Sequence, residues 1–191
     1  MKLLGPLLKR PLFTVVDAAH RGISRQILAY FVKKGILARI CAGTYQAADY
    51  EAESPLQWEN LALVAETIPK GVICLISALC YYDLTDQIMR EVWIAVPHNT
   101  RPPKRPLTRI VRMRNMKLGQ TEIMLGEHRV HIFDRERCIV DAFRYLSKEI
   151  AIKALRAYLR GTKYKPQLRK LGTYAKALRV DITPYILAYT T

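Results

Sequence analysis

The sequence predicts an α+β protein in two parts, a small N-terminal domain of residues 1–50 and a larger domain of residues 51–191. Two short helical patterns followed by a β-hairpin pattern occupy the first part. The polar run Asp49–Pro55 then interrupts the hydrophobic periodicity, as a domain boundary does. In the second part, short strand-like runs precede longer helical patterns, so we expect a small mixed sheet with helices gathered mainly after it.

The most informative stretch is the helix expected between Ser24 and Gly35. Serine is a favoured N-cap residue because its hydroxyl accepts a hydrogen bond from a free amide of the first turn. Glycine readily adopts the left-handed conformation that ends many helices. Four apolar residues recur at helical spacing and are expected to enter the core: Ile27, Leu28, Phe31 and Val32.

The opposite face of this helix carries hydrogen-bond donors and no carboxylate. Its residues are Arg25, Gln26, Ala29, Tyr30 and Lys33. Guanidinium, amide, phenol and ammonium groups suit phosphates and base edges. An ordinary solvated helix could show the same pattern, so the neighbouring elements have to distinguish the two interpretations.

Two shorter patterns precede this helix. Residues 1–12 are expected to form a short helix, with Gly5-Pro6 weakening its start. Thr14-Val-Val-Asp17 is a capping-box pattern and predicts a helix from Val15 to His20. Gly22-Ile23 is a tight link into the Ser24 helix. Two helices joined by a turn with glycine are typical of a helix-turn-helix.

A β-hairpin is expected directly after the helix pair. Ile36–Cys41 and Thr44–Ala47 are short β-type runs, and Ala42-Gly43 between them is a two-residue turn. A helix-turn-helix followed by a hairpin predicts a winged helix-turn-helix. Three residues then lie where a wing would meet the sugar–phosphate backbone of DNA: Arg39, Thr44 and Tyr45.

The second part is expected to begin with an amphipathic helix and then to build a sheet. The expected helices are Leu56–Thr67, Ser77–Tyr82, Arg135–Leu146, Ile150–Arg160 and Gln167–Leu178. The expected strands are Gly71–Ile76, Val92–Val96, Ile110–Arg114, Ile123–Leu125 and His128–Phe133. Residues 98–106 are expected to form an exposed basic loop, and Pro184 is expected to end the regular pattern.

The net charge of +15 is distributed unevenly. Residues 1–45, 101–117 and 150–191 carry net charges of +7, +7 and +8, whereas residues 46–100 carry −6 and residues 118–149 carry −1. Basic blocks around an acidic one indicate a polyanion-binding surface with a separate, oppositely charged face. We expect the acidic block either to face the basic blocks within the protein or to contact a cationic partner.

Nucleic acid is a better candidate for this polyanion than a membrane surface. No helix pairs a Lys-rich face with exposed Trp, Phe and Leu, and no apolar run approaches a membrane span. The first ten residues lack the apolar length and cleavage site of a signal peptide. The cysteines show no CxxC spacing and are expected to be reduced, buried residues of a cytoplasmic protein: Cys41, Cys74, Cys80 and Cys138.

The sequence predicts no catalytic residue and no metal site. His128 and His131 are three residues apart in a strand and point to opposite faces, so they cannot bind one metal from that strand. The GxSxG, P-loop and GxGxxG motifs do not occur. A metal-dependent nuclease targeted by the winged helix remains an alternative, in which acids of the second part would hold the ion: Asp83, Asp86 and Asp141.

Structural roles explain the other acids of the second part. Asp134 is expected to cap the helix that follows it, and Glu136 to be a first-turn charge that faces the helix dipole. Asp141 lies in an apolar patch and is expected to be a buried acid with a structural partner such as Arg109 or Arg112.

These motifs, in this order, resemble a known family. The N-terminal ones are Phe13-Thr14, Ala18-Ala19, Gly22-Ile-Ser-Arg25, Lys34-Gly35 and Gly43-Thr-Tyr45. They resemble the winged helix of the AbiEi-type antitoxins, which belong to bacterial type IV toxin–antitoxin systems. The similarity continues through Ile76–Leu79, Leu84–Asp86, Val92–Pro97, Val140–Phe143 and Pro184-Tyr185, and therefore spans nearly the whole chain.

The resemblance implies a non-catalytic bacterial protein of the cytoplasm that needs no cofactor. Its winged helix would repress its own operon by binding double-stranded DNA at promoter repeats. Its second domain would counteract a toxin that resembles nucleotidyltransferases. A plain transcriptional regulator without a toxin partner, sensing a ligand in the second domain, remains a further alternative.

The resemblance also implies DNA-binding residues by position. Four would face the major groove: Ser24, Arg25, Gln26 and Tyr30. Three would contact phosphates: Lys33, Lys34 and Arg39. Thr44 and Tyr45 would form the tip of the wing, and Thr14 completes the candidate set.

Overall fold

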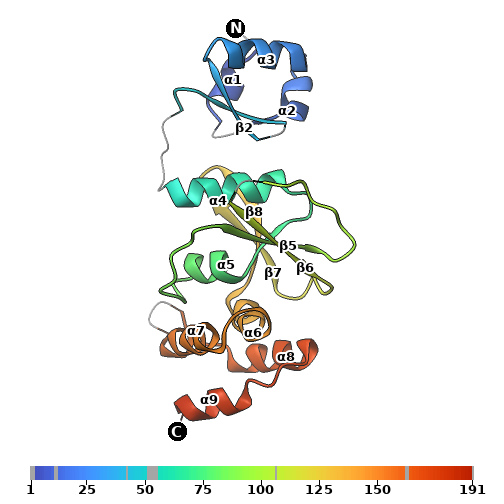
Figure 1. Ribbon diagram of the computed structural model, residues 1–191. Coiled ribbons are helices and arrows are strands. Elements are labelled where there is room, and N and C mark those ends of the chain that lie inside the picture. Colours follow the sequence, from blue (N-terminus) through green and yellow to red (C-terminus); the bar gives the residue numbers. More distant parts are fainter. Residues whose placement is uncertain are drawn as a thin grey trace.

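The computed structural model describes residues 3–10, 13–41, 43–50, 56–105, 107–161 and 164–190. Figure 1 shows the chain from its N-terminal elements in blue to its C-terminal helices in red. The described residues form one hydrophobic core from Leu4 to Tyr45 and a second from Leu61 to Ile182. The predicted α+β class is confirmed, whereas a domain boundary near residue 50 stays a prediction.

The described elements between residues 3 and 50 form a winged helix-turn-helix. Its elements are α1 (Gly5–Leu8), β1 (Phe13–Thr14), α2 (Val15–Ala19), α3 (Arg25–Lys33), β2 (Leu37–Cys41) and β3 (Thr44–Ala47). The strands pair antiparallel in the order β1-β3-β2, so β3 is the central strand. Apolar residues from these elements meet in the core, among them Leu7, Phe13, Ala18, Leu28 and Leu37.

The predicted capping box determines where α2 begins. Thr14 Oγ1 accepts a hydrogen bond from the Asp17 amide at 3.2 Å, and Asp17 Oδ2 accepts one from the Thr14 amide at 2.7 Å. Two amides that the helix itself leaves without partners are thereby satisfied. The start of α2 is therefore encoded within four residues of sequence.

Helix α3 also begins and ends as predicted. Ser24 Oγ accepts a hydrogen bond from the Ile27 amide at 3.4 Å. Gly35 has a φ of +70°, which favours glycine, and its amide donates to the Val32 carbonyl. The Ile36 amide donates to the Phe31 carbonyl, which completes a Schellman motif at the C-terminal end of α3.

The second part contains a five-stranded mixed sheet and six helices within the described residues. The helices are α4 (Leu56–Thr67), α5 (Leu75–Tyr81), α6 (Arg135–Tyr145), α7 (Lys148–Arg160), α8 (Leu168–Leu178) and α9 (Thr183–Thr190). The strands are β4 (Val72–Ile73), β5 (Val92–Pro97), β6 (Thr108–Met113), β7 (Gln120–Leu125) and β8 (His128–Phe133). The sheet order is β6-β5-β4-β8-β7, in which β5–β6 and β4–β8 are parallel and the other pairs antiparallel.

Helices α6 to α9 gather after the sheet, as expected (Figure 1). Helix α4 contacts β5, β7 and β8, whereas α6 contacts α5, α7 and α8. Helix α5 contacts both β5 and α6, so it links the sheet to the C-terminal helices. The segment of residues 82–91 connects α5 to β5, and several of its side chains are exposed.

The apolar run Gly71–Ile76 is not the single strand that we expected. Strand β4 takes two of its residues, Cys74 is the N-cap of α5, and the helix begins at Leu75. A run without polar residues fits a buried strand and a buried helix equally well, so its pattern could not locate the change. Ser77 is therefore not the cap, and its Oγ accepts a hydrogen bond from the Trp93 amide at 2.9 Å.

Two prolines expected to weaken or end regular structure lie in the first turn of a helix instead. Pro6 is in the first turn of α1, and Pro184 is in the first turn of α9. A proline there loses no helical hydrogen bond, and its fixed φ suits the helix. The expectation for Pro184 is therefore wrong, because it treated this proline as a helix-breaking residue, whereas Pro6 marks the start of a helix that is shorter than the expected 1–12.

Candidate nucleic-acid interface

Helix α3 exposes the face that the sequence predicts. Leu28 is fully buried, and Phe31 and Val32 pack against the core. The five residues of the opposite face are all exposed: Arg25, Gln26, Ala29, Tyr30 and Lys33. Ser24 and Lys34 at the two ends of the helix are exposed as well. A polyanion that approached this face would meet donors and no carboxylate.

Ile27 does not enter the core as we expected. Its side chain is 42% exposed. Successive residues are separated by about 100° around a helix, so a helix that points Leu28 inward turns Ile27 to the rim of the buried stripe. Tyr30 and Lys34, three and seven residues further along, lie on the same flank. The exposed face of α3 therefore includes one branched apolar side chain.

Tyr30 is held by two neighbours and remains accessible. Its ring meets that of Phe31 edge-on, with 5.6 Å between the centroids. Lys34 Nζ lies 5.8 Å from the centroid of the Tyr30 ring, within the range of a cation–π contact. The Tyr30 side chain is 55% exposed. The ring is thus positioned without being covered.

Asp17 is the one acid among residues 1–45, and it is engaged within the protein. Its carboxylate accepts hydrogen bonds from the Thr14 amide and hydroxyl at 2.7 and 2.6 Å and lies 3.9 Å from Arg10. Partial burial acts to raise the pKa of Asp17, but these contacts outweigh it and lower the pKa below its ordinary value. Because the Thr14 hydroxyl donates its hydrogen bond to Asp17, this residue is a poor candidate for a contact with DNA.

The basic groups on and near α3 lack acidic partners. Within the ranges that the structure describes, no carboxylate lies within 4.0 Å of four of them: Arg25, Lys33, Lys34 and Arg39. Their charge is therefore not neutralised locally, and it is available to a polyanion.

Two residues assigned to the wing tip are buried, which corrects that assignment. Thr44 is 1% and Tyr45 is 7% exposed, and the Tyr45 ring stacks on Phe13 with 6.0 Å between centroids. Both belong to β3, which β1 and β2 flank on either side. The short pairing with β1 is not visible in the sequence pattern. Among the described side chains of β2, those of Arg39 and Ile40 are exposed.

Comparison with known families supports this geometry. Residues 7–48 match the family described as transcriptional regulator, AbiEi antitoxin. This segment is similar to the AbiEi antitoxins. The AbiEi match includes α2, α3 and the wing, and it leaves the second part of the chain outside. No curated protein matches the chain. In the described ranges, no helix has both the length and the apolar character needed to span a membrane.

Outside the AbiEi segment, Asp141 of α6 is a buried acid with structural partners, as expected. Its carboxylate oxygens lie 2.6 Å from Arg137 Nε and 2.9 Å from Arg144 Nη1. The prediction that Arg109 or Arg112 would be this partner is wrong. Residues spaced by three or four positions share one face of a helix, which brings Arg137 and Arg144 to Asp141.

Arg137 is a residue that the sequence analysis missed, although its spacing from Asp141 is typical of a helical ion pair. Its guanidinium is fully buried and donates to the carbonyls of Asn115 and Leu118 at 3.0 and 2.8 Å. It also lies 4.5 Å from the centroid of the Phe133 ring. Arg137 therefore fastens α6 to the loop before β7.

Asp134 caps α6 as predicted, since its Oδ1 accepts a hydrogen bond from the Arg137 amide at 2.9 Å. Glu136 lies in the first turn, but its side chain is buried rather than solvated. It accepts a hydrogen bond from the Tyr158 hydroxyl at 2.7 Å and lies 3.1 Å from Lys170 Nζ. Burial acts to raise the pKa of Glu136, and these two partners lower it below its ordinary value.

Two residues considered for a metal site, Asp86 and His128, have other partners. Asp86 Oδ2 lies 3.5 Å from Lys153 Nζ, and His128 Nδ1 lies 2.7 Å from Glu66 Oε2. Among the described residues, no group of three or more His, Cys, Asp or Glu side chains could hold a metal ion. Two acids of the acidic block thus pair with bases of the second part itself.

The cysteines in the described core are free thiols. Cys74 and Cys138 are buried, as expected, and burial raises the pKa of both thiols well above the ordinary value. Cys80 is half-buried and donates to the Gln87 carbonyl at 3.3 Å. The side chain of Cys41 lies outside the described residues.

Proposed function

We propose that this chain is a DNA-binding autorepressor that binds repeats in its own promoter through α3. The observation that carries the proposal is the exposed, carboxylate-free face of α3 within a segment similar to the AbiEi antitoxins. A winged helix-turn-helix places this helix in the major groove. The protein would act in the cytoplasm, where bacterial DNA lies.

The residues divide into base-reading and phosphate-binding groups. Four residues at and after the start of α3 face the major groove: Ser24, Arg25, Gln26 and Tyr30. Three exposed bases contact phosphates: Lys33, Lys34 and Arg39. Thr14, Thr44 and Tyr45 are left out of this set because their side chains are used inside the domain.

Filter binding of the full chain to its promoter DNA at two salt concentrations tests the proposal. Each phosphate neutralised by Lys or Arg releases counterions and adds about −0.9 to the slope of log K against log salt. The affinity should therefore fall steeply as salt rises. An affinity that does not change with salt, or equal affinity for unrelated DNA, would contradict the proposal.

We also propose that the second part acts as an antitoxin against a nucleotidyltransferase-like toxin, directly or functionally. Support comes from the similarity of the first segment to the AbiEi antitoxins and from a second part whose acids serve structural pairs. Co-expression with the neighbouring gene tests it. Rescued growth supports an antitoxin, and toxicity that persists favours the plain transcriptional regulator.

The metal-dependent nuclease is the weaker alternative on geometric grounds. Asp141 is buried between two arginines, and Asp86 is paired with Lys153. Incubation of the protein with plasmid and Mg²⁺ or Mn²⁺ distinguishes this function. Metal-dependent nicking that disappears in Asp86→Ala would favour the nuclease.

A further inference from the structure

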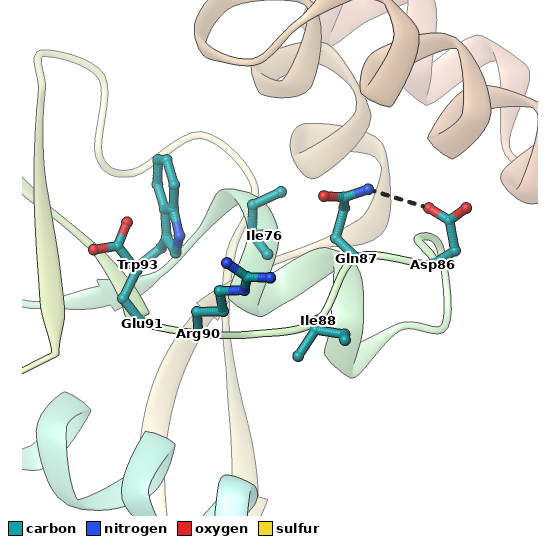
Figure 2. Close-up of a pocket in the computed structure, with 7 residues that line it drawn as sticks. All are labelled: Ile76, Asp86, Gln87, Ile88, Arg90, Glu91 and Trp93. Carbon is teal, nitrogen blue, oxygen red and sulfur yellow. Dashed lines mark hydrogen bonds between the residues drawn. The ribbon is translucent and has the colours of Figure 1, made fainter.

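A hollow of about 460 Å³ lies beside the segment that connects α5 to β5 (Figure 2). Its lining residues are Ile76, Asp86, Gln87, Ile88, Arg90, Glu91 and Trp93. Ligand sites in proteins commonly measure about 300–1,000 Å³, so a small organic molecule fits. The hollow lies outside the AbiEi segment, and the proposed function gives it no role.

Hydrogen bonds hold the walls of this hollow in place. Cys80 Sγ donates to the backbone carbonyl of Gln87 at 3.3 Å, and the backbone amide of Gln87 donates to Thr85 Oγ1 at 3.2 Å. On the β5 side, the Trp93 amide donates to Ser77 Oγ at 2.9 Å. A ligand that enters walls already ordered loses little affinity to conformational entropy.

The acids of the lining have cationic partners, but Arg90 has no acidic partner in the described ranges. Glu91 Oε1 lies 3.4 Å from Arg109 Nη1, and Asp86 Oδ2 lies 3.5 Å from Lys153 Nζ. Within the same ranges, no carboxylate lies within 4.0 Å of the Arg90 guanidinium. Lys153 also lies 3.1 Å from Glu149 Oε1, so the charges around the hollow balance, but the Arg90 guanidinium itself is not engaged in an ion pair and is available to an anion.

Apolar surface adjoins this charge. Figure 2 shows the Arg90 guanidinium pointing toward Ile76, between Trp93 and Gln87. Of the two isoleucines of the lining, Ile76 is 8% exposed and Ile88 is 80% exposed. A charged donor, an amide and an aromatic ring thus line one hollow.

We propose that this hollow binds a small organic acid, in which an anionic group is attached to an apolar or aromatic body. Arg90 holds the anionic group, because a planar guanidinium makes paired, charge-assisted hydrogen bonds to carboxylate or phosphate. Ile76 and Trp93 contact the body. An inorganic anion would contact Arg90 but not Ile76 or Trp93, and it should therefore bind more weakly.

Titration calorimetry of the full chain with benzoate, phenyl phosphate and inorganic phosphate tests this proposal. At least one of the two ring-bearing acids should bind saturably at low-millimolar concentration, and the better one identifies the anionic group. Inorganic phosphate should bind clearly more weakly. No saturable binding of either ring-bearing acid, or equally tight binding of inorganic phosphate, overturns the proposal.

Variants locate the site. Arg90→Gln should weaken binding about 10–100-fold, because hydrogen bonds to a charged group are lost. Arg112→Gln, which changes an exposed arginine of β6 outside the lining, is the matched control and should bind like the wild type. Unchanged binding in Arg90→Gln, or the same loss in both variants, overturns the assignment.

Tryptophan fluorescence gives an independent readout. The chain contains two tryptophans, so Trp58→Phe leaves Trp93 as the one indole. The emission of Trp93 should change as the acid saturates its site. Saturable binding with unchanged Trp93 emission would place the acid elsewhere and overturn the proposal.

Discussion

Arg137 Nε lies 2.6 Å from Asp141 Oδ2 one turn along α6, and both side chains are buried. Removal of two charges from water is costly, and only close pairing with further hydrogen bonds offsets the cost. The carbonyls of Asn115 and Leu118 supply such bonds to Arg137. Loss of one partner would therefore leave the other charge buried without compensation, and the pairing leaves Asp141 unavailable for a metal ion.

We expect Arg137→Met to reduce the free energy of unfolding by about 3–5 kcal/mol, because it leaves Asp141 buried without its closest partner. Urea unfolding measures the loss. Arg144→Met is the control, since the Arg144 side chain is 30% exposed and its loss should cost less. Arg137→Met with Asp141→Leu should recover stability. An equal loss in both single variants would contradict this account.

Base reading and phosphate binding should separate in the variants of α3. Arg25→Ala and Gln26→Ala should each weaken binding to the promoter site by about 1–3 kcal/mol and change binding to unrelated DNA little. Lys33→Ala should weaken all sequences alike and reduce the salt slope by about 1. Filter binding measures both effects. Equal loss on every DNA in Arg25→Ala would remove that residue from base reading.

The exposed Ile27 should contact the 5-methyl group of a thymine, since apolar side chains on a recognition helix read that methyl. Promoter DNA in which deoxyuridine replaces thymidine should therefore bind the wild type more weakly. The same replacement should not affect Ile27→Ala. A comparable loss in both proteins would show that another residue reads the methyl group.

The Asp17 capping contact should make stability depend on pH. The pKa of Asp17 in the folded protein is below its ordinary value of 3.8. The contact therefore stabilises the folded state above pH 3.8, and this contribution is lost as pH falls through the lower folded pKa. The advantage of the wild type over Asp17→Asn should disappear in acid. Calorimetric melting at several pH values tests this, and a constant difference between the two proteins would contradict it.

Elements that depend on a few neighbouring residues could be predicted from the sequence. The Thr14–Asp17 capping box and the Ser24 and Gly35 ends of α3 each close hydrogen bonds within a few residues. The exposed, carboxylate-free face of α3 follows from helical spacing alone. The sequence therefore determined the helix pair, the hairpin and, apart from Ile27, the exposed side of α3.

Packing between distant segments decided the rest. Tyr45 is buried because the pairing of β3 with β1 brings Phe13 against its ring, and no local pattern shows this pairing. The run Gly71–Ile76 divides between β4 and α5, and its pattern could not show this division because both elements are buried and equally apolar. The hollow at Arg90 exists because α5, β5 and their connection meet in space. Hydrogen bonds of caps and turns are local, whereas burial depends on which segments pack together, and only the tertiary structure shows that.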